Sequence, residues 1–208
     1  MTNKIQIKNI IRPFNKKIKI EGDKSLSIRW ALLASQSSGK STSTNILKSE
    51  DVLNTLNCIK KLGVKISMSK NKCTIHGLGI NRFTFRKKTI LNTGNSGTLA
   101  RLIMGLLIHS KNEIKIIGDA SLSKRDFKRV IKPLQKFGAK FKSNFGKLPV
   151  TIFGTVKPKP IRYLENKGSA QCKSAVMLAS INTRGETIIK AKKSRNHSEL
   201  LFKNLNIP

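Results

Sequence analysis

Residues 91–107 read Leu-Asn-Thr-Gly-Asn-Ser-Gly-Thr-Leu-Ala-Arg-Leu-Ile-Met-Gly-Leu-Leu. This pattern predicts the end of a strand, a turn of small residues and then an apolar helix. Gly94 and Gly97 allow a tight turn and a close approach to a ligand, and Asn95, Ser96 and Thr98 are good N-cap candidates. The first amides of such a helix have no partner within it, so they bind anions, and Arg101 adds a positive charge one turn later. A capped helix without a ligand is the alternative.

The same arrangement, a small polar residue followed by a helix with basic side chains near its start, occurs three times. The helix starts near Ser25, Ser96 and Ser169 are 71 and 73 residues apart (25 to 96, 96 to 169), and the strands after them recur with a similar period. The repeat predicts an α/β fold of βαβαββ-type units. The third copy is short of its last two strands, so either the chain is a fragment, which we expect, or its partner strands come from elsewhere.

The chain is strongly basic, with 42 Lys and Arg against 10 Asp and Glu in 208 residues and a formal net charge of +32. This charge predicts an anionic partner, which is a nucleic acid, an anionic membrane surface or a phosphorylated small molecule. The cations are scattered and Trp30 and Tyr163 are the single Trp and Tyr, whereas nucleic-acid modules interleave clustered cations with aromatics. Charge alone therefore does not decide among these partners, although we expect no nucleic acid. No segment is long and apolar enough to cross a bilayer, so we also expect no membrane and a cytoplasmic location.

The three cysteines, Cys58, Cys73 and Cys172, are widely spaced and do not have the spacing of metal ligands. We expect reduced thiols in a reducing compartment and no metal site. The sequence also offers no acidic pair suited to general acid–base chemistry.

Local patterns predict further elements. Residues 4–20, with recurring isoleucines, read as two short strands around a turn. Ser25 is the expected cap of the first helix. One long helix is expected over 123–137, with Arg125 in its first turn, where a cation opposes the helix dipole and so indicates an anionic ligand.

Four short motifs follow one another along nearly the whole chain. They are Gly22-Asp23-Lys24-Ser25-Leu26-Ser27-Ile28-Arg29, Gly94-Asn95-Ser96-Gly97-Thr98 with Arg101, Gly118-Asp119 through Lys124-Arg125, and Ser169-Ala170-Gln171 with Lys173-Ser174. In this order they resemble the motifs of the 5-enolpyruvylshikimate-3-phosphate (EPSP) synthase family, the 3-phosphoshikimate 1-carboxyvinyltransferases. Four motifs in the right order are far more specific than any one of them.

By this resemblance the fold is the inside-out α/β barrel-like domain of the enolpyruvyl transferases, here incomplete. Residues 1–20 would be a strand or crossing segment to the other, absent domain. Residues 21–190 would form the three-unit substrate-binding domain, and 191–208 a truncated crossing segment back. Family chains are much longer, so the sequence looks like the N-terminal half only. We expect that half to be inactive alone and the full-length protein to be a monomer.

The resemblance implies transfer of the enolpyruvyl group of phosphoenolpyruvate to the 5-hydroxyl of shikimate-3-phosphate, with release of phosphate, on the route to chorismate and the aromatic amino acids. It implies no metal or organic cofactor. Phosphoenolpyruvate would be bound by Lys24, Gly97, Arg125 and Gln171, and Lys24 would also be catalytic. Shikimate-3-phosphate would be bound by Lys24, Ser25, Arg29, Ser169, Ala170, Gln171 and Arg195.

Four residues depart from the family pattern, namely Glu21, Ile28, Asp126 and Asn196. Asp126, beside Arg125, would weaken anion binding there. Two other functions stay open, a related enolpyruvyl transferase acting on a UDP-sugar and a basic nucleic-acid-binding domain. The Gly-Asp-Lys-Ser and Ser-Ala-Gln motifs argue against the first. The second would bind nucleic acid with a steep dependence on salt.

Overall fold

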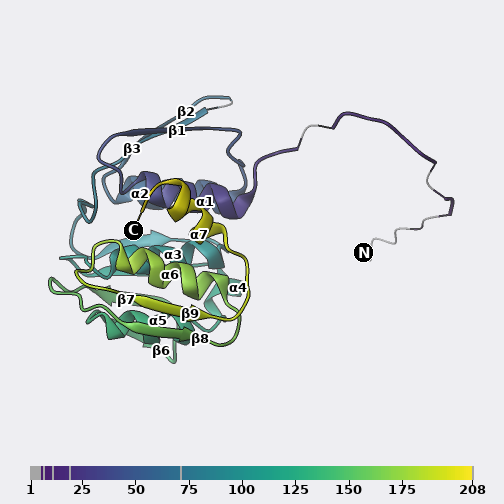
Figure 1. Ribbon diagram of the computed structural model, residues 1–208. Helices are drawn as coiled ribbons and strands as arrows, with labels where there is room; N and C mark the ends of the chain where they lie inside the picture. Colours follow the sequence, from purple (N-terminus) through teal and green to yellow (C-terminus); the bar gives the residue numbers. More distant parts are fainter. Residues whose placement is uncertain (1–5, 7, 11, 19, 71, 208) are drawn as a thin grey trace.

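A computed structural model of the chain describes residues 6, 8–10, 12–18, 20–70 and 72–207. Helices and short strands alternate from residue 24 onward, and the strands form three separate sheets (Figure 1). The elements fall into three consecutive units of similar order. The repeated α/β architecture predicted from the spacing of the helix starts is therefore confirmed.

The middle unit has the full βαβαββ order. It runs through β4 (Thr89–Asn92), α3 (Gly97–Leu107), β5 (Ile114–Ile117), α4 (Ala120–Ser123), α5 (Lys128–Lys136), β6 (Lys140–Asn144) and β7 (Lys147–Phe153). β4 and β5 are parallel, with Leu91 opposite Ile116, and the β6–β7 hairpin joins β5 antiparallel. The sheet order is β4-β5-β7-β6.

The units on either side of it follow the same plan with fewer strands. The first contains α1 (Lys24–Ala34), β1 (Lys40–Thr44), α2 (Glu50–Lys61), β2 (Lys65–Met68) and β3 (Lys72–His76). The third contains β8 (Arg162–Glu165), α6 (Ala170–Ser180), β9 (Ile188–Ala191) and α7 (His197–Asn204). β1 and β9 correspond to β5. Among the described residues β1 pairs only with β3 and β9 only with β8, so each of these strands has one open edge.

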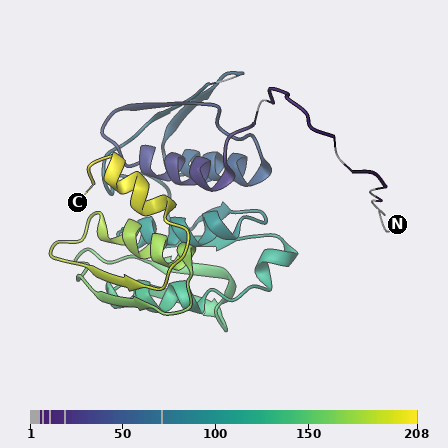
Figure 2. The ribbon, with the colours of Figure 1, turned by 45° about the vertical axis from the view of Figure 1, so that its right-hand side comes forward.

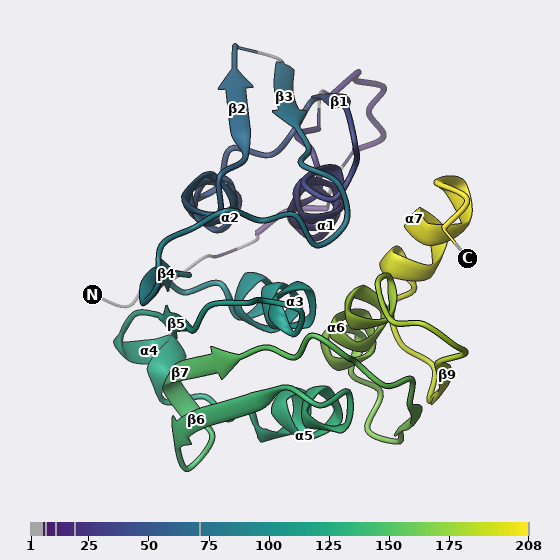
Figure 3. The same ribbon diagram turned by 90° about the vertical axis from the view of Figure 1, so that its left-hand side faces the viewer.

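The helices form the interior. Figure 3 shows α1, α3 and α6 close to end-on, with the strands of the first unit above them and those of the middle unit to one side. α3 and α6 pack closely because Gly105 has no side chain, and a Cβ at that position would overlap the carbonyl oxygen of Ala175. Ile28, Leu102 and Val176, one from each helix, are fully buried. Helices inside and sheets outside are the inside-out arrangement expected from the resemblance.

The helix expected over 123–137 is wrong in its extent, because residues 124–127 separate α4 from α5. Phe127 is fully buried, and its amide donates a 2.8 Å hydrogen bond to the carbonyl of Gly146 in the β6–β7 turn. The N-cap of α5 is Phe127, and the carboxylate of Asp126 just before it accepts from the amide of Lys128, the first residue of α5, over 2.6 Å. Arg125 consequently lies between two helices rather than in a first turn.

The two strands expected over 4–20 are wrong for the described residues of that segment, which form none. Ile10, Phe14, Ile18 and Ile20 are between 73% and 96% exposed. A strand is stable only with a paired neighbour and a covered apolar face, and the segment leads away from the body of the molecule (Figures 1 and 2). Other positions in the pattern, Ile5, Ile7 and Ile11, lie outside the described residues.

The division into 1–20, 21–190 and 191–208 stays a prediction.

Within the described part of the chain, none of the helices has the length and apolar character needed to cross a membrane.

Candidate functional site

Residues at the N-terminal ends of α1, α3 and α6 face one cavity of about 290 Å³. Each helix is capped by a side-chain oxygen, that of Asp23 for α1, Ser96 for α3 and Ser169 for α6. The expected cap of α1, Ser25, is therefore wrong. Asp23 directly precedes the helix, so its carboxylate can accept from the amide of Leu26 over 2.7 Å. Ser25 is already the second residue of the helix and lines the cavity instead.

Arg29 projects from α1 and is only 5% exposed. Its Nε donates to Ser198 Oγ over 2.9 Å, its Nη2 to Ser174 Oγ over 3.1 Å and its Nη1 to the carbonyl of Ser25 over 3.1 Å. Burial lowers the pKa of Arg29, and the negative charge of Glu199 acts against this. The guanidinium is thus a fixed positive charge at the edge of the cavity, held by hydrogen bonds to three helices.

Gln171, in the first turn of α6, is held at both ends of its amide. Its Nε2 donates to Thr98 Oγ1 over 2.9 Å, and its Oε1 accepts from Arg101 Nη1 over 3.2 Å. Arg101 in turn lies over the ring of Phe127, 4.6 Å from the centroid, and donates to the carbonyl of Gly97. Burial lowers the pKa of Arg101. Gln171 is therefore positioned by α3 from one side of the cavity.

Gly97 and Arg125 form a second group beside the cavity. A Cβ at Gly97 would lie 2.8 Å from Arg101 Nη1 and 3.1 Å from Arg125 Nη1. Arg125 is held there by a 2.9 Å hydrogen bond from its Nη2 to Asn95 Oδ1. Two guanidinium groups thus lie against the start of α3, which is an arrangement suited to a phosphate or a carboxylate.

Lys24 lies at the start of α1, with its Nζ 3.0 Å from Asp51 Oδ2 of α2. The Lys24 side chain is half exposed. An ion pair this open to water is weak, so the ammonium group can leave Asp51 for an anionic ligand at little cost.

Six of the residues predicted to bind substrate line the same cavity, and they are Ser25, Arg29, Ser169, Ala170, Gln171 and Arg195. Lys24, Gly97 and Arg125 lie outside its lining. Three other residues line the cavity but are not predicted from the sequence to bind a ligand, namely Gly168, Ser194 and His197. Thr98 also lines it and is predicted only as part of a motif.

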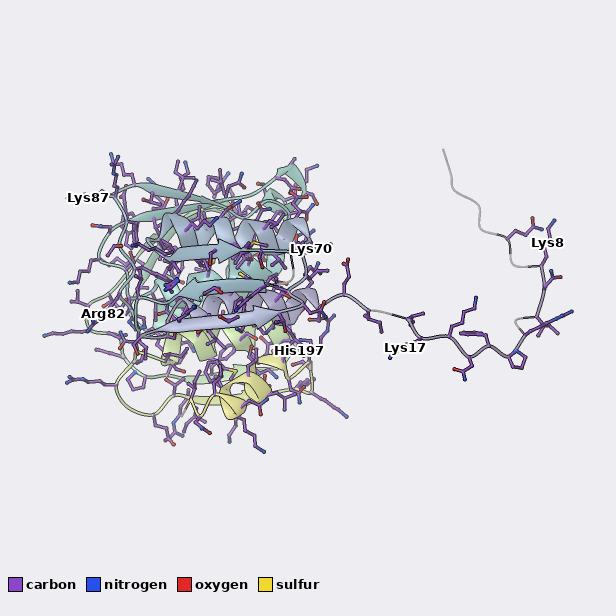
Figure 4. All side chains as sticks on the ribbon, turned by 90° about the horizontal axis from the view of Figure 1, so that it is seen from above. Lys8, Lys17, Lys70, Arg82, Lys87 and His197 are labelled. Carbon is purple, nitrogen blue, oxygen red and sulfur yellow. The ribbon has the colours of Figure 1, made fainter. Side chains whose placement is uncertain are left out.

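Ser194 and His197 have the clearest structural signal of these. Ser194 Oγ and His197 Nδ1 are buried and have no hydrogen-bond partner among the described residues. Buried polar atoms are rarely left unpaired, so both suit the polar atoms of a ligand. Figure 4 shows His197 near the end of the body from which the N-terminal segment leaves, with Arg82 and Lys87 at the opposite end. In the sequence, the polar run 194–198, which leads into α7, was the signal that could have indicated these two residues.

Three helix N-termini and several guanidinium groups lie around one cavity within a repeated α/β fold, an arrangement suited to small anionic molecules. The sequence model of the EPSP synthase (3-phosphoshikimate 1-carboxyvinyltransferase) family matches residues 8–208. The chain belongs to this family.

Individual relatives agree with this. The chain is 42% identical over 200 residues to the 3-phosphoshikimate 1-carboxyvinyltransferase of Ruthia magnifica subsp. Calyptogena magnifica, covering 94% of this chain and 46% of the relative. It is also 42% identical to that of Vesicomyosocius okutanii over 204 residues. A solved EPSP synthase from Acinetobacter baumannii superposes with a TM-score of 0.85 at 36% identity, over 90% of this chain and 43% of that one. The chain thus spans about half the length of the relatives it matches.

Proposed function

We propose that the chain binds shikimate-3-phosphate as part of a 3-phosphoshikimate 1-carboxyvinyltransferase. The supporting observation is that Arg29 of α1, Gln171 of α6 and Arg195, just before α7, line one cavity. Helix N-termini and guanidinium groups bind phosphate and carboxylate. The amide of Gln171 and the hydroxyls of Ser25 and Ser169 suit the hydroxyl groups of a cyclic alcohol.

In the proposed reaction the 5-hydroxyl oxygen of shikimate-3-phosphate forms a bond to the enolpyruvyl group of phosphoenolpyruvate, and inorganic phosphate leaves. Phosphoenolpyruvate is bound by Lys24, Gly97, Arg125 and Gln171. Lys24 is the catalytic residue, because its ammonium group can stabilise the negative charge that develops on the departing phosphate. Asp51 keeps that ammonium group near the start of α1 until the ligand arrives.

The chain alone binds substrate but does not turn it over. The described residues that line the cavity include no carboxylate. Addition of the 5-hydroxyl to the enol phosphate and the later elimination of phosphate both require proton transfers. We place the groups for those transfers outside this chain.

A cytoplasmic location stays a prediction, supported by three cysteines that are buried free thiols. The full-length monomer and the absence of a nucleic-acid partner also stay predictions.

Calorimetric titration of the chain with shikimate-3-phosphate tests the proposal. Arg195→Ala and Gln171→Ala should each raise the Kd about tenfold or more, which corresponds to about 1.4 kcal/mol. Arg195 is exposed, so its loss does not threaten the fold. The matched control is Arg82→Ala, which removes an exposed arginine at the opposite end of the body (Figure 4).

An unchanged Kd in both variants would refute the proposed site. The alternative function, a basic nucleic-acid-binding domain, would be favoured by a different result. In that case a nucleic acid would bind with a steep dependence on salt, and its binding would abolish that of shikimate-3-phosphate.

A further inference from the structure

Glu165 is a buried carboxylate in a chain that has few acidic residues. It is the last residue of β8 and is only 4% exposed. Its Oε2 accepts a 2.6 Å hydrogen bond from the hydroxyl of Tyr163. Its Oε1 accepts from Arg129 Nη2 over 3.0 Å and from the amide of Lys167 over 2.9 Å.

These partners come from three different parts of the fold. Tyr163 lies on β8, Arg129 on α5, and Lys167 in the turn between β8 and α6. The nearby amide of Ser169, the N-cap of α6, acts to lower the pKa of the carboxylate. Glu165 therefore holds the turn 166–169 against α5 and β8.

The negative charge matters for this role. Burial acts to raise the pKa of Glu165, but the hydrogen bonds from Tyr163 and the amide of Lys167 act against it, as do the nearby amide of Ser169 and the charge of Arg129. Together they leave the pKa below its usual value. The carboxylate is consequently ionised at neutral pH. Hydrogen bonds to an ionised acceptor are about twice as strong as neutral ones, so one side chain fixes several backbone and side-chain donors.

The turn that Glu165 holds leads directly into the cavity. Gly168, Ser169, Ala170 and Gln171 all line it, whereas Glu165 does not. We propose that Glu165 is a positioning residue, which sets the place of Ser169 and Gln171 for the anionic ligand without touching that ligand. The identity of the ligand rests on the proposed function, but the positioning of the turn does not.

Glu165→Gln tests the role, because it removes the charge and keeps the size of the side chain. Hydrogen exchange should become about tenfold faster at the amides of 167–172 and stay unchanged in α1 and α3. The Kd for shikimate-3-phosphate should rise about tenfold. The matched control is Glu186→Gln, which removes the same charge from an exposed residue of the same unit.

Tyr163→Phe provides a second variant that leaves the carboxylate in place. It removes one of the donors to Glu165, so exchange in the turn and the Kd should change in the same direction as in Glu165→Gln but by less. This variant decides the question if Glu165→Gln does not fold.

The possible outcomes separate the two proposals. Unchanged exchange in the turn, faster exchange spread evenly over the whole unit, or faster exchange in the turn with an unchanged Kd would each overturn the positioning role. If the unaltered chain binds no shikimate-3-phosphate, the proposed function fails, and the exchange data alone then decide whether Glu165 holds the turn.

Discussion

Arg29 and Ser198 are separated by 169 positions in the sequence, yet Arg29 Nε donates a 2.9 Å hydrogen bond to Ser198 Oγ. Ser198 Oγ in turn donates to Ser174 Oγ over 2.6 Å, and Ser174 also accepts from the Arg29 guanidinium. Both serines are buried. This hydrogen-bonded triangle joins α1, α6 and α7, and therefore links the first unit to the third.

Ser198→Ala should destabilise the chain by about 1.5–3 kcal/mol, because it leaves a buried guanidinium donor unpaired. Urea unfolding measures the loss as a lower midpoint with the same slope. Ser38→Ala, at an exposed position between α1 and β1, is the control and should be close to neutral. Equal midpoints for the two variants would show that the triangle does not stabilise the fold.

Gly105→Ala should destabilise the chain by about 1–3 kcal/mol, because the added methyl group would overlap the carbonyl oxygen of Ala175 and push α3 away from α6. Helix propensity alone predicts the opposite sign, a gain of about 1 kcal/mol. Thermal or urea unfolding shows whether the substitution lowers or raises the free energy of unfolding. The control is Gly39→Ala, since nothing lies within 4 Å of a Cβ placed there. A stabilised Gly105→Ala variant would disprove the close helix contact.

Gly97→Ala should impair the site more than the fold. The methyl group would press on the ends of the Arg101 and Arg125 side chains, which can shift. We expect the concentration of phosphoenolpyruvate needed to saturate the chain, measured by chemical-shift titration with shikimate-3-phosphate present, to rise about tenfold. The free energy of unfolding should change by less than about 1 kcal/mol. If a folded Gly97→Ala variant is saturated at the same concentration of phosphoenolpyruvate as the unaltered chain, this expectation is contradicted.

The stability of the chain should depend on pH through His109. Burial lowers the pKa of His109, and the 3.1 Å hydrogen bond between its Nε2 and the carbonyl of Ala179 only partly opposes this. The folded state therefore prefers the neutral ring, and the unfolded chain binds more protons once the pH falls below about 6.5. The free energy of unfolding should consequently fall between about pH 7.5 and about pH 5.5.

His109→Gln removes this titration and keeps a donor for Ala179. Urea unfolding at the two pH values should show a smaller decrease for the variant than for the unaltered chain. An equal decrease in both would assign the pH dependence to other groups.

Several parts of the site could be predicted from the sequence because they depend on short, local patterns. Small residues before a helix and basic residues in its first turns indicated where Ser25, Arg29 and Gln171 would lie, and the repeat indicated that the three helix starts are equivalent. The equivalence of units does not by itself bring their helix starts together. That convergence follows from the side-by-side packing of α1, α3 and α6.

Other features depend on contacts between distant segments, which a sequence pattern does not contain. The hydrogen bonds from Arg29 to Ser174 and Ser198, and the ion pair of Lys24 with Asp51, are of this kind. The break between α4 and α5 arises because the buried Phe127 is bonded to the turn at Gly146. Choosing between Asp23 and Ser25 as the cap of α1 required the backbone geometry, since either side chain is a suitable acceptor.

The open edges of β1 and β9 affect how the chain must be handled. Unpaired strand edges offer rows of free amide and carbonyl groups to which another molecule's strand can add, which is a common route to aggregation. The large net positive charge opposes such encounters by repulsion between molecules, but added salt screens that repulsion. The chain should therefore be purified and stored at low ionic strength, and clouding of its solutions should begin as salt is raised rather than as it is removed.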